Sequence, residues 1–235
     1  MPSIKPAPRS NLGKLRGIIF DWDGVLAVTM EGNFQAWFQA FAPHGITVPR
    51  HEYFLLEGMS AMEVARHFLK TNGLGLEAAA EIRKRKDEIF LEKNQLVLYP
   101  EVTNILTMVL QHGISMALVT GASRTRLAGS GALEFLSGFK TIVTADDVKN
   151  GKPDPESYVK SLKGLQLSPW ECLVIENAPF GIRAAKQAGI PVLALTTTLA
   201  AEFLQEADWI LGGLEAFPNW LEHHADSGKY ERHTS

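Results

Sequence analysis

The stretch GIIFDWDGVLAVT at positions 17–29 constrains the fold of this 235-residue chain more than any other. Its first four residues are apolar and partly β-branched, which is typical of a fully buried strand. Asp21 and Asp23 follow at once, and Gly24 permits a turn behind them. The pattern predicts two carboxylates at the end of a central strand, where open α/β sheets place their ligands.

Two neighbouring carboxylates repel each other and favour a bound cation, most simply Mg²⁺. A carboxylate beside a metal ion can also act as a nucleophile, as in enzymes that form an aspartyl phosphate. An acidic turn without chemistry is the alternative, because short acidic turns are common. The stretch alone leaves both interpretations open.

Length, charge and cysteine content limit the kinds of protein that this chain can be. A chain of this length with 46% hydrophobic residues can bury a full core. The net charge of −3 gives no general case for binding nucleic acid or an acidic membrane. No apolar run reaches the length of a membrane span, and residues 1–12 suggest a loose tail rather than a signal peptide. The single cysteine, Cys172, lies in an apolar run, so we expect a buried structural thiol and a reducing cytoplasm.

Beyond residue 99 the pattern alternates between strands and helices. The alternation predicts a parallel sheet with crossover helices, that is, a Rossmann-like, doubly wound α/β core. Strands are expected at 17–20, 115–119, 141–143, 171–175, 191–195 and 209–211, and helices at 101–112, 123–135, 155–163, 179–188 and, a short one, 199–207. His223 and His224 beyond the last strand are expected in a solvated tail.

Residues 29–98 contain no evident strand and predict a helical cap inserted after the first strand. Phe34, Trp37, Phe38 and Phe41 recur at helical spacing. A capping box at Ser60 predicts a helix over 61–70, and a third helix is expected over 77–93. The run RKRK at 83–86 is interpreted as a solvated helix face. The expected division is a tail at 1–12, a core at 13–28 and 99–235, and a cap at 29–98.

Further polar residues follow the later strands. Thr120 offers a hydroxyl and Gly121-Ala122 offer backbone N–H groups next to a helix start, which suits an anion, although plain N-capping by Ser123 is the alternative. Lys152 stands in the stiff loop GKPDP and can pair with phosphate. Glu176-Asn177 end another buried strand with two oxygen-bearing side chains. Each signal is weak alone, but their order along the chain makes them strong together.

Over residues 17–217 the chain resembles the haloacid dehalogenase superfamily, in the β-phosphoglucomutase-like and pyrophosphatase-like branch of phosphatases with a helical cap. The motifs are DWDGVL at 21–26, Thr120-Gly121, Lys152 in GKPDP, and IENAPFGIRAAKQAG, which contains Glu176-Asn177. The resemblance implies Mg²⁺ as the cofactor and a small phosphorylated metabolite as the substrate.

The resemblance also implies roles for single residues. Asp21 would be the nucleophile and Asp23 the general acid and base. The phosphate ligands would be Thr120, the backbone of Gly121 and Ala122, and Lys152; the metal ligands would be Asp21, the backbone carbonyl of Asp23, Glu176 and Asn177.

Four departures from the family pattern bear on function. Val28-Thr29 stand where the family has Asp-Ser, so we expect a supporting hydrogen bond to be lost. The fourth motif ends in Asn177 rather than an acid, which removes one negative charge. In the cap, Gly58-Met59 and Asn33 replace an Arg and a His that sugar-phosphate mutases carry. Glu57-Gly58 resembles a pair that supplies a cap metal ligand in pyrophosphatase-like relatives, although a plain solvated acid is an equal alternative.

The sequence therefore predicts a cytoplasmic, Mg²⁺-dependent phosphatase that forms an aspartyl phosphate on a sugar phosphate or on pyrophosphate. A β-phosphoglucomutase-type mutase is the first alternative, and a non-catalytic regulatory protein on the same fold is the second. We expect a monomer or weak dimer without nucleic-acid or membrane partners.

Overall fold

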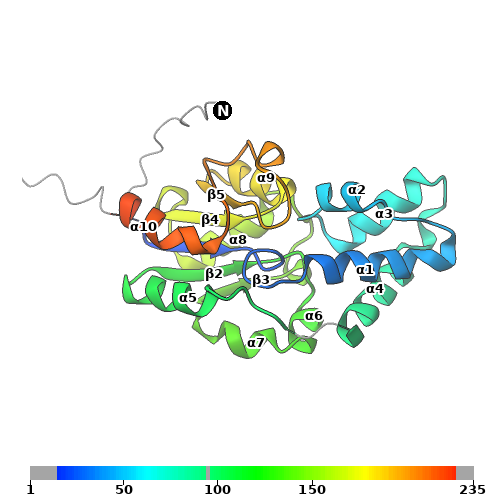
Figure 1. Cartoon of the computed structure of the whole chain (residues 1–235), viewed down its shortest axis with the longest axis horizontal. Coiled ribbons are helices and arrows are strands. Elements are labelled where there is room, and N and C mark those ends of the chain that lie inside the picture. The colour runs from blue at the N-terminus through cyan, green and yellow to red at the C-terminus, as the bar shows by residue number, and fades with distance from the viewer. Residues whose placement is uncertain (1–14, 94–95, 226–235) are drawn as a thin grey trace, which may run out of the picture.

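A six-stranded parallel sheet forms the centre of the molecule (Figure 1). The structure, a computed structural model, describes residues 15–93 and 96–225, so the tail predicted at 1–12 lies outside them. The strands are β1 (Gly17–Phe20), β2 (Ser115–Val119), β3 (Thr141–Val143), β4 (Cys172–Glu176), β5 (Val192–Leu195) and β6 (Trp209–Leu211). Their order is β3-β2-β1-β4-β5-β6, so β1 lies between β2 and β4 and carries Asp21 to the middle of the sheet edge.

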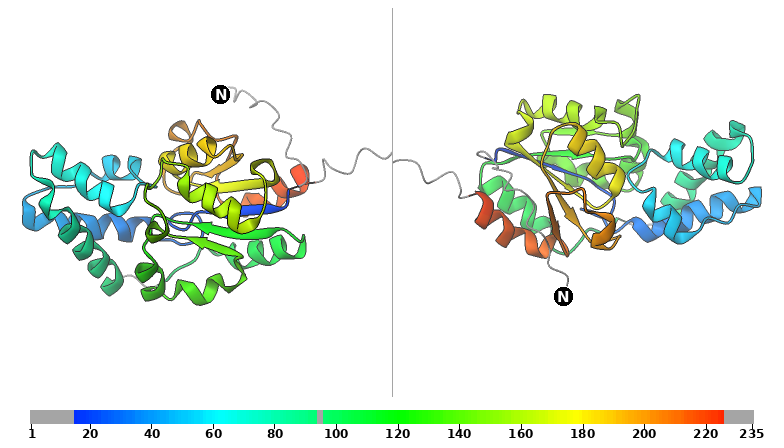
Figure 2. Two further views of the ribbon diagram at one scale, coloured as in Figure 1. Left: turned by 180° about the vertical axis from the view of Figure 1, so that it is seen from behind. Right: turned by 90° about the horizontal axis from the view of Figure 1, so that it is seen from above.

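Helices cover both faces of the sheet (Figure 2). They are α5 (Val102–Gln111), α6 (Arg124–Gly129), α7 (Ala132–Phe135), α8 (Glu156–Leu165), α9 (Pro179–Gln187) and α10 (Phe217–Ala225). Side chains of β1 alternate between the faces: Ile19 packs with α8 and α9, whereas Ile18 and Phe20 pack with α5 and α10. Because both faces are covered, the strand is fully buried and apolar, as predicted.

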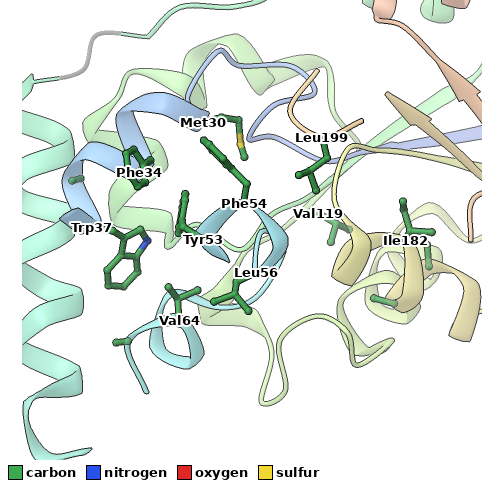
Figure 3. Close-up of a cluster of buried hydrophobic side chains, with 14 of the residues drawn as sticks. Met30, Phe34, Trp37, Tyr53, Phe54, Leu56, Val64, Val119, Ile182 and Leu199 are labelled. Carbon is green, nitrogen blue, oxygen red and sulfur yellow. The ribbon is translucent and has the colours of Figure 1, made fainter. Parts of the chain in front are cut away.

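The segment between β1 and α5 forms a separate layer of helices at one end of the molecule (Figure 1). Its α-helices are α1 (Met30–Phe41), α2 (Arg50–Leu55), α3 (Ala61–Thr71) and α4 (Ala79–Lys93). Aromatic rings from α1 and α2 pack inside it, with Phe34 5.8 Å from Tyr53 between ring centroids (Figure 3). The doubly wound core with an inserted helical cap is therefore confirmed, while the exact division at residues 13, 29 and 99 stays a prediction.

Several predicted elements are corrected by the structure. The helix expected over 123–135 is two helices, α6 and α7, separated by Gly131 at φ +79°. The short helix expected over 199–207 is a single 3₁₀ turn at Ala201–Phe203. Helices α2 and α10 were not predicted. His223 and His224 lie in the last turn of α10 rather than in a tail. His223 is exposed to solvent, as expected, whereas His224 is half-buried and stacks on Trp220 at 4.3 Å.

The predictions for Cys172 and Ser60 are confirmed, and the structure also shows where Trp22 lies. Cys172 is fully buried, and burial raises the pKa of its thiol to about 12, so it is a structural thiol. Trp22, between the two acids, is 2% exposed and packs against Phe135 away from the carboxylates. The Ser60 hydroxyl accepts a hydrogen bond from Glu63 N at 3.2 Å and caps α3. Across the described ranges, no helix is long and apolar enough to cross a membrane.

Candidate active site

Asp21, Lys152 and Glu176 meet at the carboxyl edge of the sheet. The Lys152 ammonium donates to Asp21 Oδ1 at 2.7 Å and to Glu176 Oε1 at 2.6 Å. Asp21 follows β1 and Glu176 ends β4, and because the two strands pair in parallel their carboxyl ends coincide. Lys152 comes from the loop after β3, as the motif order predicts.

Glu176 is the most fully bonded member of this group. Its Oε1 also accepts from the Tyr158 hydroxyl at 2.8 Å, and its Oε2 accepts from the backbone N–H groups of Asn177 and Ala178 at 2.9 and 3.2 Å. The side chain is completely buried. Glu176 therefore orients Lys152 and the loop after β4 in this structure, and it would reach a metal ion only by exchanging one of these donors.

The charges of the group are not balanced. One ammonium, Lys152, lies between two carboxylates, and their attraction outweighs burial and holds its pKa well above the usual range. Burial, together with Glu176 and Asp23, raises the pKa of Asp21 well above its usual value, although Lys152 opposes the rise. A divalent cation beside Asp21 would remove this surplus of negative charge.

The loop around Gly24 and Asn177 holds an oxygen that suits such a cation. Asn177 Oδ1 is buried and has no hydrogen-bond partner, while its Nδ2 donates to Thr198 at 2.9 Å and so fixes the amide. Gly24, at φ +80°, lies so close that an added Cβ would stand 2.1 Å from Asn177 Nδ2. No group of three or more His, Cys, Asp or Glu within residues 15–93 and 96–225 is arranged to hold a metal ion. The Mg²⁺ prediction depends instead on Asp21, Asn177 Oδ1 and the backbone carbonyl of Asp23, an all-oxygen set that fits this ion.

The predicted phosphate ligands lie at the end of β2. Thr120 is 4% exposed, and its hydroxyl accepts from Ala122 N at 3.0 Å. Gly121 faces the cap, since an added Cβ would stand 3.3 Å from the Met59 carbonyl oxygen. Ser123 caps α6 by accepting a hydrogen bond from Arg126 N at 3.1 Å, as the N-capping alternative expects, and the phosphate-binding role of Thr120 stays a prediction.

Asp23 is held by a second set of side chains, which come mainly from helices. The Thr29 hydroxyl donates to Asp23 Oδ1 at 2.6 Å, so Thr29 makes a supporting hydrogen bond, and the loss expected from the apolar Val28 stays a prediction. Asn33, on α1, donates to the same oxygen at 3.1 Å. Thr29 thus supplies a hydroxyl in place of the family's Ser, and Asn33 keeps a polar contact where mutases have a His.

Arg126 and Lys86 complete this set and were not predicted from the sequence. Arg126 donates to both oxygens of Asp23, at 3.2 Å from Nη1 to Oδ1 and more closely from Nη2 to Oδ2. Lys86 Nζ donates to Asn33 Oδ1 at 2.7 Å. Burial favours the protonated form of Asp23, but Arg126 outweighs it and lowers the pKa of Asp23.

The solvated face expected for residues 83–86 is wrong at Lys86, whose side chain is 5% exposed. Lys86 shares a buried stripe of α4 with Ile82, Ile89 and Phe90, at spacings of three and four residues. Burial lowers the pKa of Lys86 to about 8, with Arg126 acting in the same direction. The stripe spacing was the signal that could have identified Lys86, whereas Arg126 has no comparable signal on its short helix.

The two sets of side chains line one cavity of about 590 Å³ between core and cap. From the core come Asp21, Asp23, Thr120, Arg126, Lys152 and Asn177, and from the cap Asn33, Trp37, Tyr53, Glu57 and Lys86. Glu57 has one buried oxygen, Oε1, without a hydrogen-bond partner, and burial raises the pKa of its carboxyl to about 7. Its loop is seated on the core, because an added Cβ at Gly58 would stand 2.9 Å from Gly181 N.

Comparison with known proteins assigns the family. Residues 18–195 match the model of the haloacid dehalogenase-like hydrolases. The chain belongs to this family. It is 34% identical over 202 residues to validoxylamine A 7'-phosphate phosphatase of Streptomyces hygroscopicus subsp. limoneus, covering 83% of this chain and 92% of that protein.

One further relative and one solved structure are also similar to this chain. Hexitol phosphatase A of Escherichia coli is 29% identical over 202 residues, covering 86% of this chain and 93% of that protein. The crystal structure of β-phosphoglucomutase from Clostridium difficile has a TM-score of 0.79 over 90% of this chain and 97% of that chain, and at 23% identity it shows the fold alone. The predicted superfamily and its phosphatase class are thus confirmed.

Proposed function

We propose that this protein is a Mg²⁺-dependent phosphatase that hydrolyses a small phosphorylated metabolite of the sugar-phosphate class through an aspartyl phosphate on Asp21. The observation that carries the proposal is the pairing of Asp21 with Lys152 at 2.7 Å in a cavity that also holds Asp23 and Thr120. The two relatives named as phosphatases support the reaction class.

In the first step an oxygen of Asp21 attacks phosphorus, and the bond between phosphorus and the ester oxygen breaks. Lys152 occupies Asp21 Oδ1, so we assign the attack to Oδ2. Asp23 passes a proton to the leaving oxygen. Since Arg126 lowers the pKa of Asp23 in the free protein, that proton must arrive with the substrate, as the monoanion of the phosphate ester.

In the second step water attacks the phosphorus of the aspartyl phosphate, Asp23 accepts a proton from that water, and Asp21 leaves as a carboxylate. Lys152, the Thr120 hydroxyl and the backbone N–H of Gly121 hold the phosphoryl oxygens. The N–H of Ala122 joins them by exchanging its hydrogen bond to the Thr120 oxygen. Catalysis then consists of positioning and charge stabilisation, because little other covalent chemistry is required.

Asp21, Asn177 Oδ1 and the Asp23 carbonyl would hold the Mg²⁺, with Glu176 as the further predicted ligand. When bound, the ion supplies positive charge for the phosphoryl oxygens. The orphaned, buried Asn177 Oδ1 supports this ligand set. Glu57 is proposed as an additional ligand from the cap, because its buried Oε1 has no hydrogen-bond partner, although the Tyr53 hydroxyl bonds to the same carboxyl group.

The cavity favours a sugar phosphate over pyrophosphate. Its volume of about 590 Å³ exceeds what a second phosphate alone would fill, and Asn33, Tyr53 and Lys86 line its cap side with hydrogen-bonding groups. Pyrophosphate remains the alternative that Glu57 motivates, since a carboxylate drawn to the metal leaves less room for a leaving group.

The proposal is tested by measuring phosphate release from a panel of hexose, hexitol and pentose phosphates together with pyrophosphate, each with Mg²⁺ and with a chelator. We expect release that depends on Mg²⁺ and is fastest for a sugar or hexitol phosphate. Release from no member of the panel would favour the non-catalytic alternative, and release that ignores the chelator would contradict the metal site.

The mutase alternative is separated by a second assay. Conversion of glucose 1-phosphate to glucose 6-phosphate in the presence of a bisphosphate activator would identify a mutase, whereas free phosphate as the main product identifies a phosphatase. Asn33 and Gly58-Met59, which replace a His and an Arg of the mutases, favour the phosphatase. We further propose that the protein acts in the cytoplasm, consistent with its one buried cysteine.

A further inference from the structure

Asp23 is bonded far more heavily than a solvent-exposed acid–base residue would be. Its side chain is 13% exposed, and its Oδ1 accepts from Thr29 at 2.6 Å, from Asn33 at 3.1 Å and from Arg126 at 3.2 Å, while Oδ2 accepts from Arg126 Nη2. The planar guanidinium donates to both carboxylate oxygens, which fixes the plane of the carboxylate as well as its position.

Arg126 is itself held rigidly. Its side chain is 7% exposed, and its guanidinium carbon lies 5.0 Å from the centre of the Phe90 ring on α4. Phe90 thus supports one face of the group from the cap, and the backbone N–H of Arg126 is tied to Ser123 at 3.1 Å. A buried cation of this kind is well suited to hold another side chain in place.

The same guanidinium is connected to the cap through Asn33. Arg126 Nη1 donates to Asn33 Oδ1 at 3.3 Å, and Lys86 donates to that oxygen at 2.7 Å. Asn33 Nδ2 then donates to Asp23. Helix α1 of the cap and α6 of the core therefore meet at the Asp23 carboxylate, and α4 is joined to them through Asn33.

We propose that Arg126 is a positioning residue that fixes Asp23 for proton transfer. The inference rests on the proposed function, because it takes Asp23 as the group that moves the proton. It adds a residue from α6 that acts on the reaction through Asp23 and does not bind the transferred phosphoryl group.

A double-mutant cycle between Arg126→Met and Asp23→Asn tests this directly. The readout is kcat and KM for p-nitrophenyl phosphate and for a hexose phosphate, with Mg²⁺ present. We expect Arg126→Met to lower kcat by about 10²-fold, the loss typical of a misplaced catalytic group, with KM nearly unchanged. In the Asp23→Asn background the same substitution should change kcat by no more than about twofold, because it has no acid left to position.

Two further variants make the cycle decisive. Arg126→Lys keeps the charge but loses the planar guanidinium, so we expect a kcat between those of the wild type and Arg126→Met. Arg124→Met is the matched control, since Arg124 lies on the same helix, is 51% exposed and pairs with Asp147 at 3.2 Å. Thermal unfolding checks each variant, and if Arg126→Met is unfolded, Arg126→Gln replaces it in the cycle.

An unchanged kcat in folded Arg126→Met would overturn the inference. It would also be overturned if Arg126→Met lowered kcat as much in the Asp23→Asn background as in the wild type. A loss confined to KM would instead make Arg126 a substrate ligand and also overturn it. In each of these cases an active wild type leaves the proposed function standing. A wild type that hydrolyses no phosphate ester would overturn the proposed function and, with it, the inference.

Discussion

The cavity has two halves that are built in different ways. The strand-end half consists of Asp21, Lys152 and Asn177, which follow β-strands of one parallel sheet, and of the fully buried Glu176 at the end of β4, which supports them from behind the cavity wall. The helix-borne half consists of Asn33, Lys86 and Arg126, which come from α1, α4 and α6; Asn33 and Arg126 bond to Asp23, and Lys86 bonds to Asn33. The strand-end half depends on sheet topology alone, whereas the helix-borne half exists only when cap and core are packed together.

This difference suggests that the two halves have separate roles in the reaction. In the proposed reaction the strand-end half supplies the nucleophile, the lysine that contacts the phosphoryl group and ligands of the metal, and it would be present wherever the cap lies. The helix-borne half positions Asp23 for proton transfer. The following predictions test whether the two halves behave as separate units.

The largest effect is expected in the strand-end half. Asp21→Asn should abolish turnover, with a loss of several orders of magnitude, because an amide is a poor nucleophile and a weaker metal ligand. Phosphate release at saturating Mg²⁺ measures it. Asp146→Asn is the control, since Asp146 lines the same cavity without an assigned role and should retain the wild-type rate. More than about a tenth of the wild-type rate in Asp21→Asn would exclude the aspartyl phosphate.

A smaller effect is expected where the two halves meet. Asp23→Asn should lower kcat by about 10²–10⁴-fold, the usual contribution of general acid–base catalysis. The affinity for Mg²⁺ should stay the same, because only the backbone carbonyl at this position is assigned to the ion. The loss should be smaller for p-nitrophenyl phosphate than for an alkyl phosphate, since a good leaving group needs less protonation. Equal losses on both substrates would count against an acid role in the first step.

Glu57 tests whether the cap also reaches the metal. If Glu57 is a ligand, Glu57→Ala should need more Mg²⁺ for half-maximal rate, by about 10-fold or more, the range seen when a contact that supports a metal is lost. It should also lose pyrophosphate activity more than hexose phosphate activity. The matched control is Glu63→Ala, because Glu63 lines the cavity but pairs with Arg66 at 2.6 Å. A Mg²⁺ titration that matches the wild type would remove Glu57 from the metal site.

The smallest effect concerns the stability of the helix-borne half. The folded state holds the pKa of Lys86 at about 8 against the usual 10.5, so between these pH values the unfolded chain binds more protons. The free energy of unfolding of the wild type should therefore rise with pH across that window, relative to Lys86→Met, by up to about 3 kcal/mol. Urea unfolding at pH 7.5, 9 and 10.5 measures the difference. Lys84→Met is the control, since the Lys84 side chain is 76% exposed. If the free energy of unfolding changes with pH in the same way in Lys86→Met and Lys84→Met, a buried, charged Lys86 is contradicted.

The strand-end half could be predicted from the sequence because each of its residues ends a strand or lies in the loop that follows one. β1, β2, β3 and β6 have the predicted bounds, since their apolar runs end sharply at polar or glycine residues. A parallel sheet brings all such ends to one edge, so order along the chain was enough to assemble Asp21, Lys152 and Glu176.

The helix-borne half could not be assembled in this way, because helix packing does not follow from local sequence. Lys86 stands inside a run of four basic residues, and only its register with Ile82 and Ile89 distinguishes it from its exposed neighbours. Arg126 lies three residues after a capping serine, a place where most side chains meet solvent, and its burial requires Phe90 from the cap. Helix α10 was not predicted, although Phe217, Trp220 and Leu221 have helical spacing. These side chains cover the second face of the sheet, and that packing does not follow from the local sequence.

The central claim, that Asp21 carries the phosphoryl group, is tested most directly by mass spectrometry of the acid-quenched protein during turnover of p-nitrophenyl phosphate. We expect one added phosphoryl group on the wild type, located on the peptide that contains Asp21 and lost when the sample is treated with hydroxylamine, and none on Asp21→Asn. Asp23→Asn should retain the added group for longer, because the second step lacks its base. An active wild type that carries no phosphoryl group at any quench time, or carries it on another residue, would contradict the account.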